Sequence, residues 1–225
     1  MKLSIIVPVY NLERYIAATL ESLLSIRFSY EYEIVVINDG SEDKSEAVIK
    51  KYQHKHSNIV LYTIENQGVS TARNLGVKNA RGQYITFVDG DDTVESDFFE
   101  KAVRELDSGR YDFVQGNFIT INCCRKLNSQ FSDVDVEISD TKSILELFFS
   151  PRKIIHNTVW GKVFCADIAK NTFFDSSISV SEDQKYIFDI ICKAKRIKIM
   201  KEQAINYYLR DSSVIHTMDT KKFND

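Results

Sequence analysis

Hydrophobic residues in the first half of the chain alternate between short continuous runs and stretches in which they recur every three or four positions. Continuous β-branched runs predict buried strands, and the three-to-four spacing predicts amphipathic helices. The predicted strands are 4–7, 33–37, 59–64, 83–88 and 112–121, and the predicted helices are 12–24, 41–54, 69–80 and 95–106, with Ser41 as the N-cap of the second helix. Strands joined by crossover helices indicate a Rossmann-like α/β fold with a doubly wound, mostly parallel sheet.

The second half of the chain has a weaker pattern. Residues 122–140 are polar except for an alternating trio, Val134, Val136 and Ile138, which predicts an edge strand. Further elements are expected as helices at 142–149 and 182–194, an apolar run at 159–164, and short strands at 197–200 and 205–209. Because no linker or repeat separates the halves, we expect a single domain with an α/β half, 1–121, and a smaller mixed half, 122–225.

Composition narrows the classes of function. The 29 Lys and Arg residues against 32 Asp and Glu residues give a formal net charge of −3, so no general basic field favours nucleic acid as a partner. The apolar stretch before Pro8 is too short for a signal peptide, and no apolar run is long enough for a membrane span. Four cysteines without metal-site spacing do not form a disulfide framework. The expected location is the cytoplasm.

Polar residues follow the predicted strands at the edge where α/β sheets bind ligands. The first strand ends in Pro8-Val9-Tyr10-Asn11, without the glycine-rich turn of dinucleotide-binding folds, and no phosphate-binding P-loop motif occurs. Asp39 ends the second strand. Its carboxylate is a candidate acceptor for hydrogen bonds from a base or a ribose, although a turn aspartate before a helix is an equal alternative.

The strongest chemical signal is the run Phe87-Val88-Asp89-Gly90-Asp91-Asp92 after the fourth strand. Three carboxylates so close together repel one another unless a cation neutralises them, and Mg²⁺ or Mn²⁺ is commonly held by one or two carboxylates plus phosphate oxygens. We expect Gly90 to let the backbone turn so that Asp89 and Asp91 point the same way. A plain acidic turn is the alternative.

A helix start lies between these two motifs. If Val69 begins the helix, Arg73 lies one turn in, and the positive end of the helix dipole faces the same crevice. A surface salt bridge, or a purely structural pairing with the aspartates, is the alternative for Arg73.

Taken in order, PVYN, NDGS, NQGVSTARNLG and FVDGDD resemble family 2 glycosyltransferases of the GT-A fold, over about residues 3–100. The resemblance implies that 1–121 is a nucleotide-sugar-binding half and 122–225 an acceptor-side half. It implies a nucleoside-diphosphate sugar donor, with a UDP-sugar favoured, and Mn²⁺ or Mg²⁺ as cofactor. The implied donor contacts are Pro8, Val9, Tyr10 and Asp39 for the base and ribose, Asn66 and Arg73 nearby, and Asp89, Gly90 and Asp91 at the diphosphate, with Asp91 as the principal metal ligand and Asp89 at the ribose or the metal.

The second half resembles the branch of the family that builds bacterial polysaccharides, through 159–164 and Ser181-Glu182-Asp183. The resemblance implies that Asp183 is the catalytic base of an inverting transfer to a hydroxyl of a glycan or lipid-linked acceptor. Helical spacing predicts that Asp183 faces the crevice while Glu182 leans towards solvent. A helix-capping sequence is the alternative for these three residues. Near the C-terminus, Arg210 is expected to close over the diphosphate, and His216 is either a third metal ligand or a solvated side chain.

Two other classes of function stay open. One is a non-catalytic sugar-nucleotide or glycan-binding protein on the same fold. The other is a sugar nucleotidyltransferase, which needs a glycine-rich loop carrying Arg or Lys after the first strand, and PVYNLERY does not supply one. The resemblance also leaves open peripheral contact with the inner face of the cell membrane and a homo-oligomer.

Overall fold

The fold is known from a computed structural model, which describes residues 1–122, 125–129, 133–151 and 154–209. Its centre is one sheet with the strand order β3-β2-β1-β4-β9-β6-β10-β5, to which β7 is added at β6 and β8 at β10. The strands are β1 (Leu3–Val9), β2 (Tyr32–Asp39), β3 (Ile59–Ile64), β4 (Tyr84–Phe87), β5 (Thr93–Val94), β6 (Phe113–Asn122), β7 (Arg125–Ser129), β8 (Val136–Ile138), β9 (Lys162–Cys165) and β10 (Ile197–Leu209). The helices are α1 (Ile16–Leu24), α2 (Ser45–Gln53), α3 (Val69–Asn79), α4 (Phe98–Asp107), α5 (Thr141–Phe148), α6 (Ala166–Lys170) and α7 (Glu182–Lys193).

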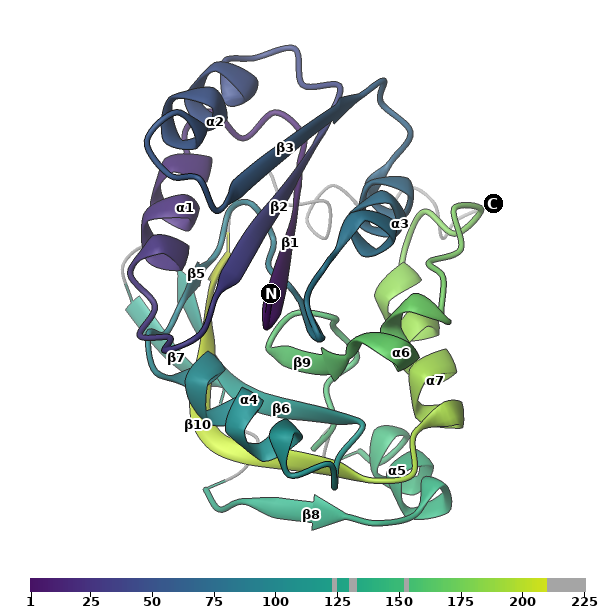
Figure 1. Ribbon diagram of the computed structural model, residues 1–225. Coiled ribbons are helices and arrows are strands. Elements are labelled where there is room, and N and C mark those ends of the chain that lie inside the picture. The colour runs from purple at the N-terminus through teal and green to yellow at the C-terminus, as the bar shows by residue number, and fades with distance from the viewer. Residues whose placement is uncertain (123–124, 130–132, 152–153, 210–225) are drawn as a thin grey trace.

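Helices cover both faces of the parallel part of the sheet (Figure 1). Strands β3, β2, β1 and β4 are parallel, and every residue of β1 is buried. Alternate residues of β1 point to opposite faces: Leu3 and Ile5 pack in the cluster that holds α1, α2 and α4, and Ile6 packs in the cluster that holds α3, α5, α6 and α7. This two-sided burial explains the continuous apolar runs and confirms the predicted doubly wound α/β fold, in which the whole sheet is mixed, with parallel and antiparallel pairs.

The second half of the chain completes the same sheet. Strand β9 is antiparallel to both β4 and β6 and lies between them, and β10 runs parallel to β6. Through β9, the second half of the chain is hydrogen-bonded directly to β4.

The structure differs locally from the predicted elements. The two strands predicted at 197–200 and 205–209 form the single strand β10, which passes its polar middle through register shifts around Gln203. Strand β7 was not predicted, because it pairs with β6 through the backbone and its polar sequence has no strand periodicity. The predicted N-cap at Ser41 is wrong: α2 begins at Ser45, and the Ser41 hydroxyl instead accepts a hydrogen bond from the backbone N–H of Asn11, 3.0 Å away.

Candidate functional site

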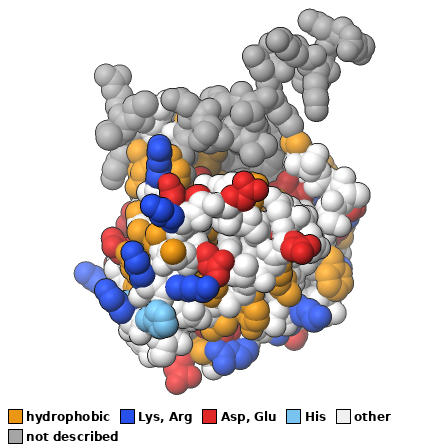
Figure 2. Space-filling view, turned by 90° about the horizontal axis from the view of Figure 1, so that it is seen from above, with side chains coloured by type: hydrophobic (Ala, Val, Ile, Leu, Met, Phe, Trp, Pro, Cys, Tyr) orange, Lys and Arg blue, Asp and Glu red, His pale blue; other side chains and the backbone are white. Residues whose placement is uncertain are grey.

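The candidate site lies at the edge where β1, β2 and β4 end. Because these strands are parallel, their carboxyl ends meet at one side of the sheet. Asn11 ties the first two loops together, since its side-chain Oδ1 accepts from the backbone N–H of Glu42 at 2.8 Å. In the view onto this end of the molecule, acidic side chains are scattered over the face, and Lys and Arg side chains gather along its left side (Figure 2).

Gly90 brings the end of β1 against the acidic turn after β4. A Cβ atom at this position would lie 2.9 Å from Leu12 Cδ1 and 3.0 Å from the Pro8 carbonyl oxygen. The Thr19 hydroxyl also donates to the carbonyl of Gly90 at 2.9 Å. Gly90 does not have a positive φ, so its small size serves the close packing of this turn against the end of β1, and the orientation expected for Asp89 and Asp91 stays a prediction. Asp89 and Asp91 thereby lie next to the PVYN segment.

The residues expected at the base and ribose have different exposures. Tyr10 is 46% exposed and Asn66 is exposed, whereas Pro8 and Val9 are buried. Asp39 is buried, and its two carboxylate oxygens accept from the backbone N–H groups of Gln67 and Gly68, at 2.9 and 2.8 Å. Asp39 therefore shapes the loop before α3, and its contact with a nucleotide stays a prediction.

Arg73 is the centre of the site and is not a surface residue. Its side chain is 4% exposed and packs over the ring of Phe174, with Cζ 5.4 Å from the ring centroid. Nη2 donates to Asp89 at 2.9 Å, and Nη1 donates to Glu182 at 3.0 Å and to Asp183. The guanidinium thus joins the end of β4 to the start of α7. Both Nη atoms are bound to carboxylates, so Arg73 positions these acidic groups, and its expected place near the donor stays a prediction.

Both acids at the start of α7 face the site. The side chains of Glu182 and Asp183 are 15% and 18% exposed, so the prediction that Glu182 leans towards solvent is wrong. The reason is that a single donor, Nη1 of Arg73, binds the carboxylates of both residues in the first turn of α7. Ser181 makes no side-chain capping hydrogen bond and has a φ of 65°, so the helix-cap alternative does not describe it.

Asp183 has the electrostatics of a base that works near neutral pH. Burial raises the pKa of its carboxyl to about 6, and the nearby charges of Asp89 and Glu182 act in the same direction. Arg73 and the backbone N–H of Val159, which donates to Asp183 Oδ2 at 3.1 Å, lower the pKa and limit the rise. The carboxylate therefore ionises close to the pH at which general bases are most useful.

The acidic turn after β4 fits a cation that arrives with a phosphate-bearing ligand. Among the described residues, no group of three or more His, Cys, Asp or Glu side chains forms a complete metal cage. Asp89 and Asp91 offer two carboxylates in one turn, both partly exposed, although one oxygen of Asp89 is held by Arg73. Mg²⁺ and Mn²⁺ suit such a partial set, because phosphate oxygens and waters complete their coordination.

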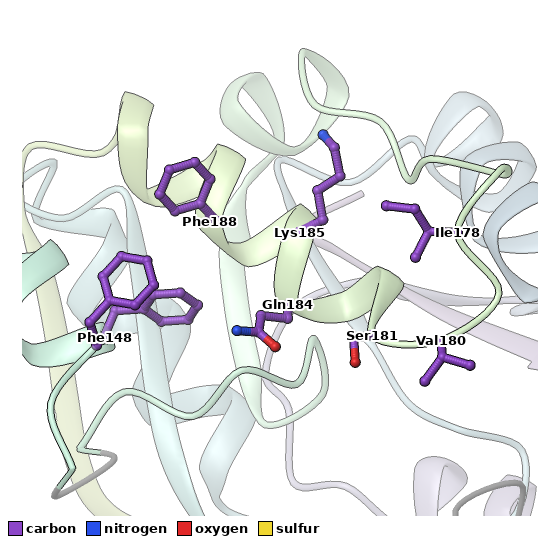
Figure 3. A pocket seen from close by; sticks show the side chains of 8 residues that line it. Phe148, Ile178, Val180, Ser181, Gln184, Lys185 and Phe188 are labelled. Atoms are coloured by element: carbon purple, nitrogen blue, oxygen red, sulfur yellow. The ribbon is translucent and has the colours of Figure 1, made fainter. Parts of the chain in front are cut away.

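A shallow apolar hollow of about 410 Å³ flanks the same turn of α7 (Figure 3). Ser181 and Gln184, which bracket the acid pair, line it beside Phe188, and Val180 and Phe148 lie at its two ends. The exposed ring of Phe149 extends it. The hollow places apolar surface next to the candidate base, on the side supplied by the second half of the chain.

Two buried side chains were missed at the sequence level. His156 has neighbours that its loop position did not indicate: Thr158 and Lys162 lie 2.8 Å from Nδ1. Lys162 is completely buried at the start of β9. No sequence signal marks either residue, because the carbonyls and side chains that they contact leave no pattern along the chain. Arg210, expected to close over a diphosphate, and His216, expected as a third metal ligand or a solvated side chain, lie outside the described residues.

The comparisons with known proteins identify relatives of one family. The sequence model described as glycosyl transferase family 2 matches residues 4–173. The minor teichoic acid biosynthesis protein GgaB of Bacillus subtilis is 32% identical over 97% of this chain and 24% of its own length, and the uncharacterized glycosyltransferase EpsJ of the same organism is 31% identical over 88% and 58%. This chain thus spans a quarter to somewhat over half of these relatives.

Solved structures give the same result. The crystal structure of residues 1–349 of TarS from Staphylococcus aureus in complex with UDP matches 94% of this chain and 61% of that chain, with 26% identity and a TM-score of 0.79. The structure of the same protein in complex with UDP-GlcNAc matches 95% of this chain and 60% of that chain, with a TM-score of 0.81. A TarS sequence from the organism is named a poly(ribitol-phosphate) beta-N-acetylglucosaminyltransferase and is 29% identical to this chain over 92% of it and 35% of its own length. Within the described part of the chain, no helix has the length and apolar character needed to cross a bilayer.

Proposed function

Because this chain belongs to glycosyl transferase family 2 and has the GT-A fold, we propose that it is an inverting, metal-dependent glycosyltransferase. It transfers a sugar from a nucleoside-diphosphate sugar to a hydroxyl of a cell-surface glycan or its lipid-linked precursor. The observation that carries the proposal is the cluster around Arg73, which joins the acidic turn after β4 to the candidate base on α7.

The donor is proposed to be a UDP-sugar. Support comes from the TarS structures, which hold UDP and UDP-GlcNAc on the same fold. In this chain the exposed side chains of Tyr10 and Asn66 and the loop shaped by Asp39 lie at the strand ends where a nucleotide binds in α/β folds.

Asp91 and Asp89 would hold a divalent cation against the diphosphate. A bound Mg²⁺ or Mn²⁺ supplies charge neutralisation of the leaving nucleoside diphosphate and helps to orient it. Arg73 keeps the carboxylate of Asp89 directed to the donor side by binding its Oδ1.

Asp183 accepts the proton of the acceptor hydroxyl, whose oxygen attacks the anomeric carbon from the face opposite to the leaving group. Oδ1 of Asp183 is bound by Arg73, and Oδ2 accepts one long hydrogen bond from Val159. A carboxylate oxygen accepts more than one hydrogen bond, so Oδ2 retains capacity for the incoming hydroxyl.

The acceptor is proposed to belong to cell-surface glycan synthesis, as the names of GgaB and the poly(ribitol-phosphate) transferases suggest for those relatives. The hollow beside α7 lies on the acceptor side in this scheme. Peripheral membrane contact and a homo-oligomer stay predictions.

The test compares the two acids of α7. UDP release from UDP-GlcNAc and other UDP-sugars is measured with Mn²⁺, with and without poly(ribitol phosphate) as a trial acceptor, together with UDP binding by calorimetry. Asp183→Asn is expected to lower turnover by about 10²–10⁴-fold while UDP binding is kept, since a general base contributes about this much. Glu182→Gln, the matched control one residue away, is expected to keep substantial turnover. An active Asp183→Asn would refute the assignment, and an inactive Glu182→Gln beside it would move the base to Glu182.

A further inference from the structure

Lys162 is a buried cation that the proposed reaction leaves unused. It opens β9 with its side chain in the interior, and burial lowers the pKa of its ammonium. Nζ donates to the carbonyl oxygens of His156 and Thr158, at 2.8 and 2.7 Å, and lies 2.8 Å from His156 Nδ1. Three acceptors match the three donors of an ammonium group. A buried charge is costly without such partners, so these contacts require an explanation.

The imidazole of His156 completes this arrangement in its neutral form. Nε2 lies 3.3 Å from the carbonyl oxygen of Gly116, which only accepts, so the network assigns the proton to Nε2. Nδ1 is then the acceptor that faces both the ammonium of Lys162 and the hydroxyl of Thr158, and its single lone pair is shared between them. Burial and the charge of Lys162 hold the pKa of His156 well below its usual value, which agrees with a neutral ring.

These contacts close the segment 156–162 into a turn behind the candidate base. Lys162 holds the carbonyl oxygens on one side of Val159, and the backbone N–H of Val159 donates to Asp183 Oδ2. Two elements therefore bind the carboxylate of Asp183: Arg73 of α3 at Oδ1 and the turn before β9 at Oδ2 (Figure 1). The charge of Asp183 in turn favours the protonated form of the buried Lys162 ammonium, against the burial that lowers its pKa.

We propose that Lys162 is a positioning residue for Asp183, because it fixes the turn of 156–160 so that Val159 orients the carboxylate towards the acceptor hydroxyl. This inference rests on the proposed function, in which Asp183 is the base. Without the ammonium, two buried carbonyls and an imidazole lose their donor, the turn relaxes, and Asp183 loses both an oriented N–H and a nearby positive charge. Misplacement of a catalytic group by about 1 Å typically costs about 10²-fold in rate.

The charges that face Asp183 set the expected pH effect. Arg73 approaches from α3, Asp89 from the end of β4, Glu182 from α7 and Lys162 from β9. Removing Lys162 takes away one of the two cations and leaves all the anions. Ionisation of Asp183 then becomes harder, so the acidic limb of the rate profile moves to higher pH.

The experiment uses Lys162→Met, with Lys170→Met as the matched control. Lys170 also donates to a backbone carbonyl, that of Ala80 at 2.8 Å, but it lies at the end of α6. We expect folded Lys162→Met to lose about 10- to 100-fold in kcat for a UDP-sugar, to bind UDP with an affinity within about threefold, and to shift the acidic limb to higher pH. Lys170→Met is expected to change neither kcat nor the limb.

His156→Leu serves as a second variant in case Lys162→Met does not fold, because it removes one of the three acceptors of Nζ and keeps both carbonyls. It is expected to move kcat and the limb in the same directions by a smaller amount. The inference would be overturned if the folded variants kept both kcat and the acidic limb of the pH–rate profile unchanged. In that case a loss of transfer in Asp183→Asn would still support the proposed function. An active Asp183→Asn would remove the proposed function itself.

Discussion

Replacing Arg73 with methionine removes the only guanidinium bound to Asp89, Glu182 and Asp183 among the described residues, while it keeps most of the apolar length of the side chain. Removing one partner of a buried ion pair typically costs about 3–5 kcal/mol, because the remaining charge is left uncompensated. The cost here depends on pH, because the carboxylates can take up protons in place of the cation.

The magnitude follows from proton linkage. Arg73 lowers the pKa of Asp183, which is about 6 with the guanidinium present, so the variant raises it further. Between pH 6 and 8 the native variant then holds at least one proton that the unfolded chain has released. Because the native state binds more protons, stability falls as pH rises, by about 1.4 kcal/mol per pH unit and proton. We expect a loss of about 3 kcal/mol at pH 6 and about 5 kcal/mol at pH 8.

The free energy of unfolding is measured by urea titration at pH 6 and pH 8 without divalent cations. The fluorescence of the single tryptophan, Trp160, follows the transition. Arg104→Met is the matched control, since Arg104 is 68% exposed and pairs with Glu100 in the next turn of α4. Such exposed pairs contribute about 0–1 kcal/mol. A loss for Arg73→Met that equals the control, or that does not grow with pH, would refute the reasoning.

Four further results are expected. The turnover of a UDP-sugar at saturating donor should rise with pH through about 6, because Asp183 accepts a proton only when it is ionised; a rate that is flat from pH 4.5 to 8 would contradict this. Calorimetry should show UDP bound at least about 10-fold more weakly in excess chelator than with Mn²⁺, because Asp89 and Asp91 repel a bare diphosphate, and equal affinities would exclude the cation. Asp39→Ala should weaken UDP binding about 10-fold while kcat at saturating donor changes less than about threefold, since it frees the loop at 67–68 far from the reacting bond; an unchanged KM for the donor would make Asp39 a turn residue only. Gly90→Ala should lower the free energy of unfolding by about 1–3 kcal/mol through its contact with Leu12, and a stable variant would show that the β1 end can move.

Local pattern was sufficient for the elements of the first half. The runs in β1 and β2 and the spacing of Ile16, Leu20 and Leu23 in α1 report burial directly, because each side chain packs on a face that its own sequence neighbours define. The order of the motifs after the strands also predicted that Asp39, Asp89 and Asp91 gather at one edge, since parallel strands bring their carboxyl ends together. The second half has fewer such signals. Its strand β7 and the continuous β10 depend on pairing with β6, which sequence periodicity does not report.

The sequence by itself determined the parallel α/β frame, the acidic turn after β4 and the acid pair at the start of α7. Only the tertiary structure decided what surrounds them. Arg73 binds carboxylates 109 and 110 positions away, and Lys162 turns inward to hold backbone carbonyls. No pattern of residues along the chain marks either set of contacts. The physical reason is that a hydrophobic pattern is set by which face of an element is buried. The partner of a buried charge is set by which loops the packed sheet brings within about 3 Å of it.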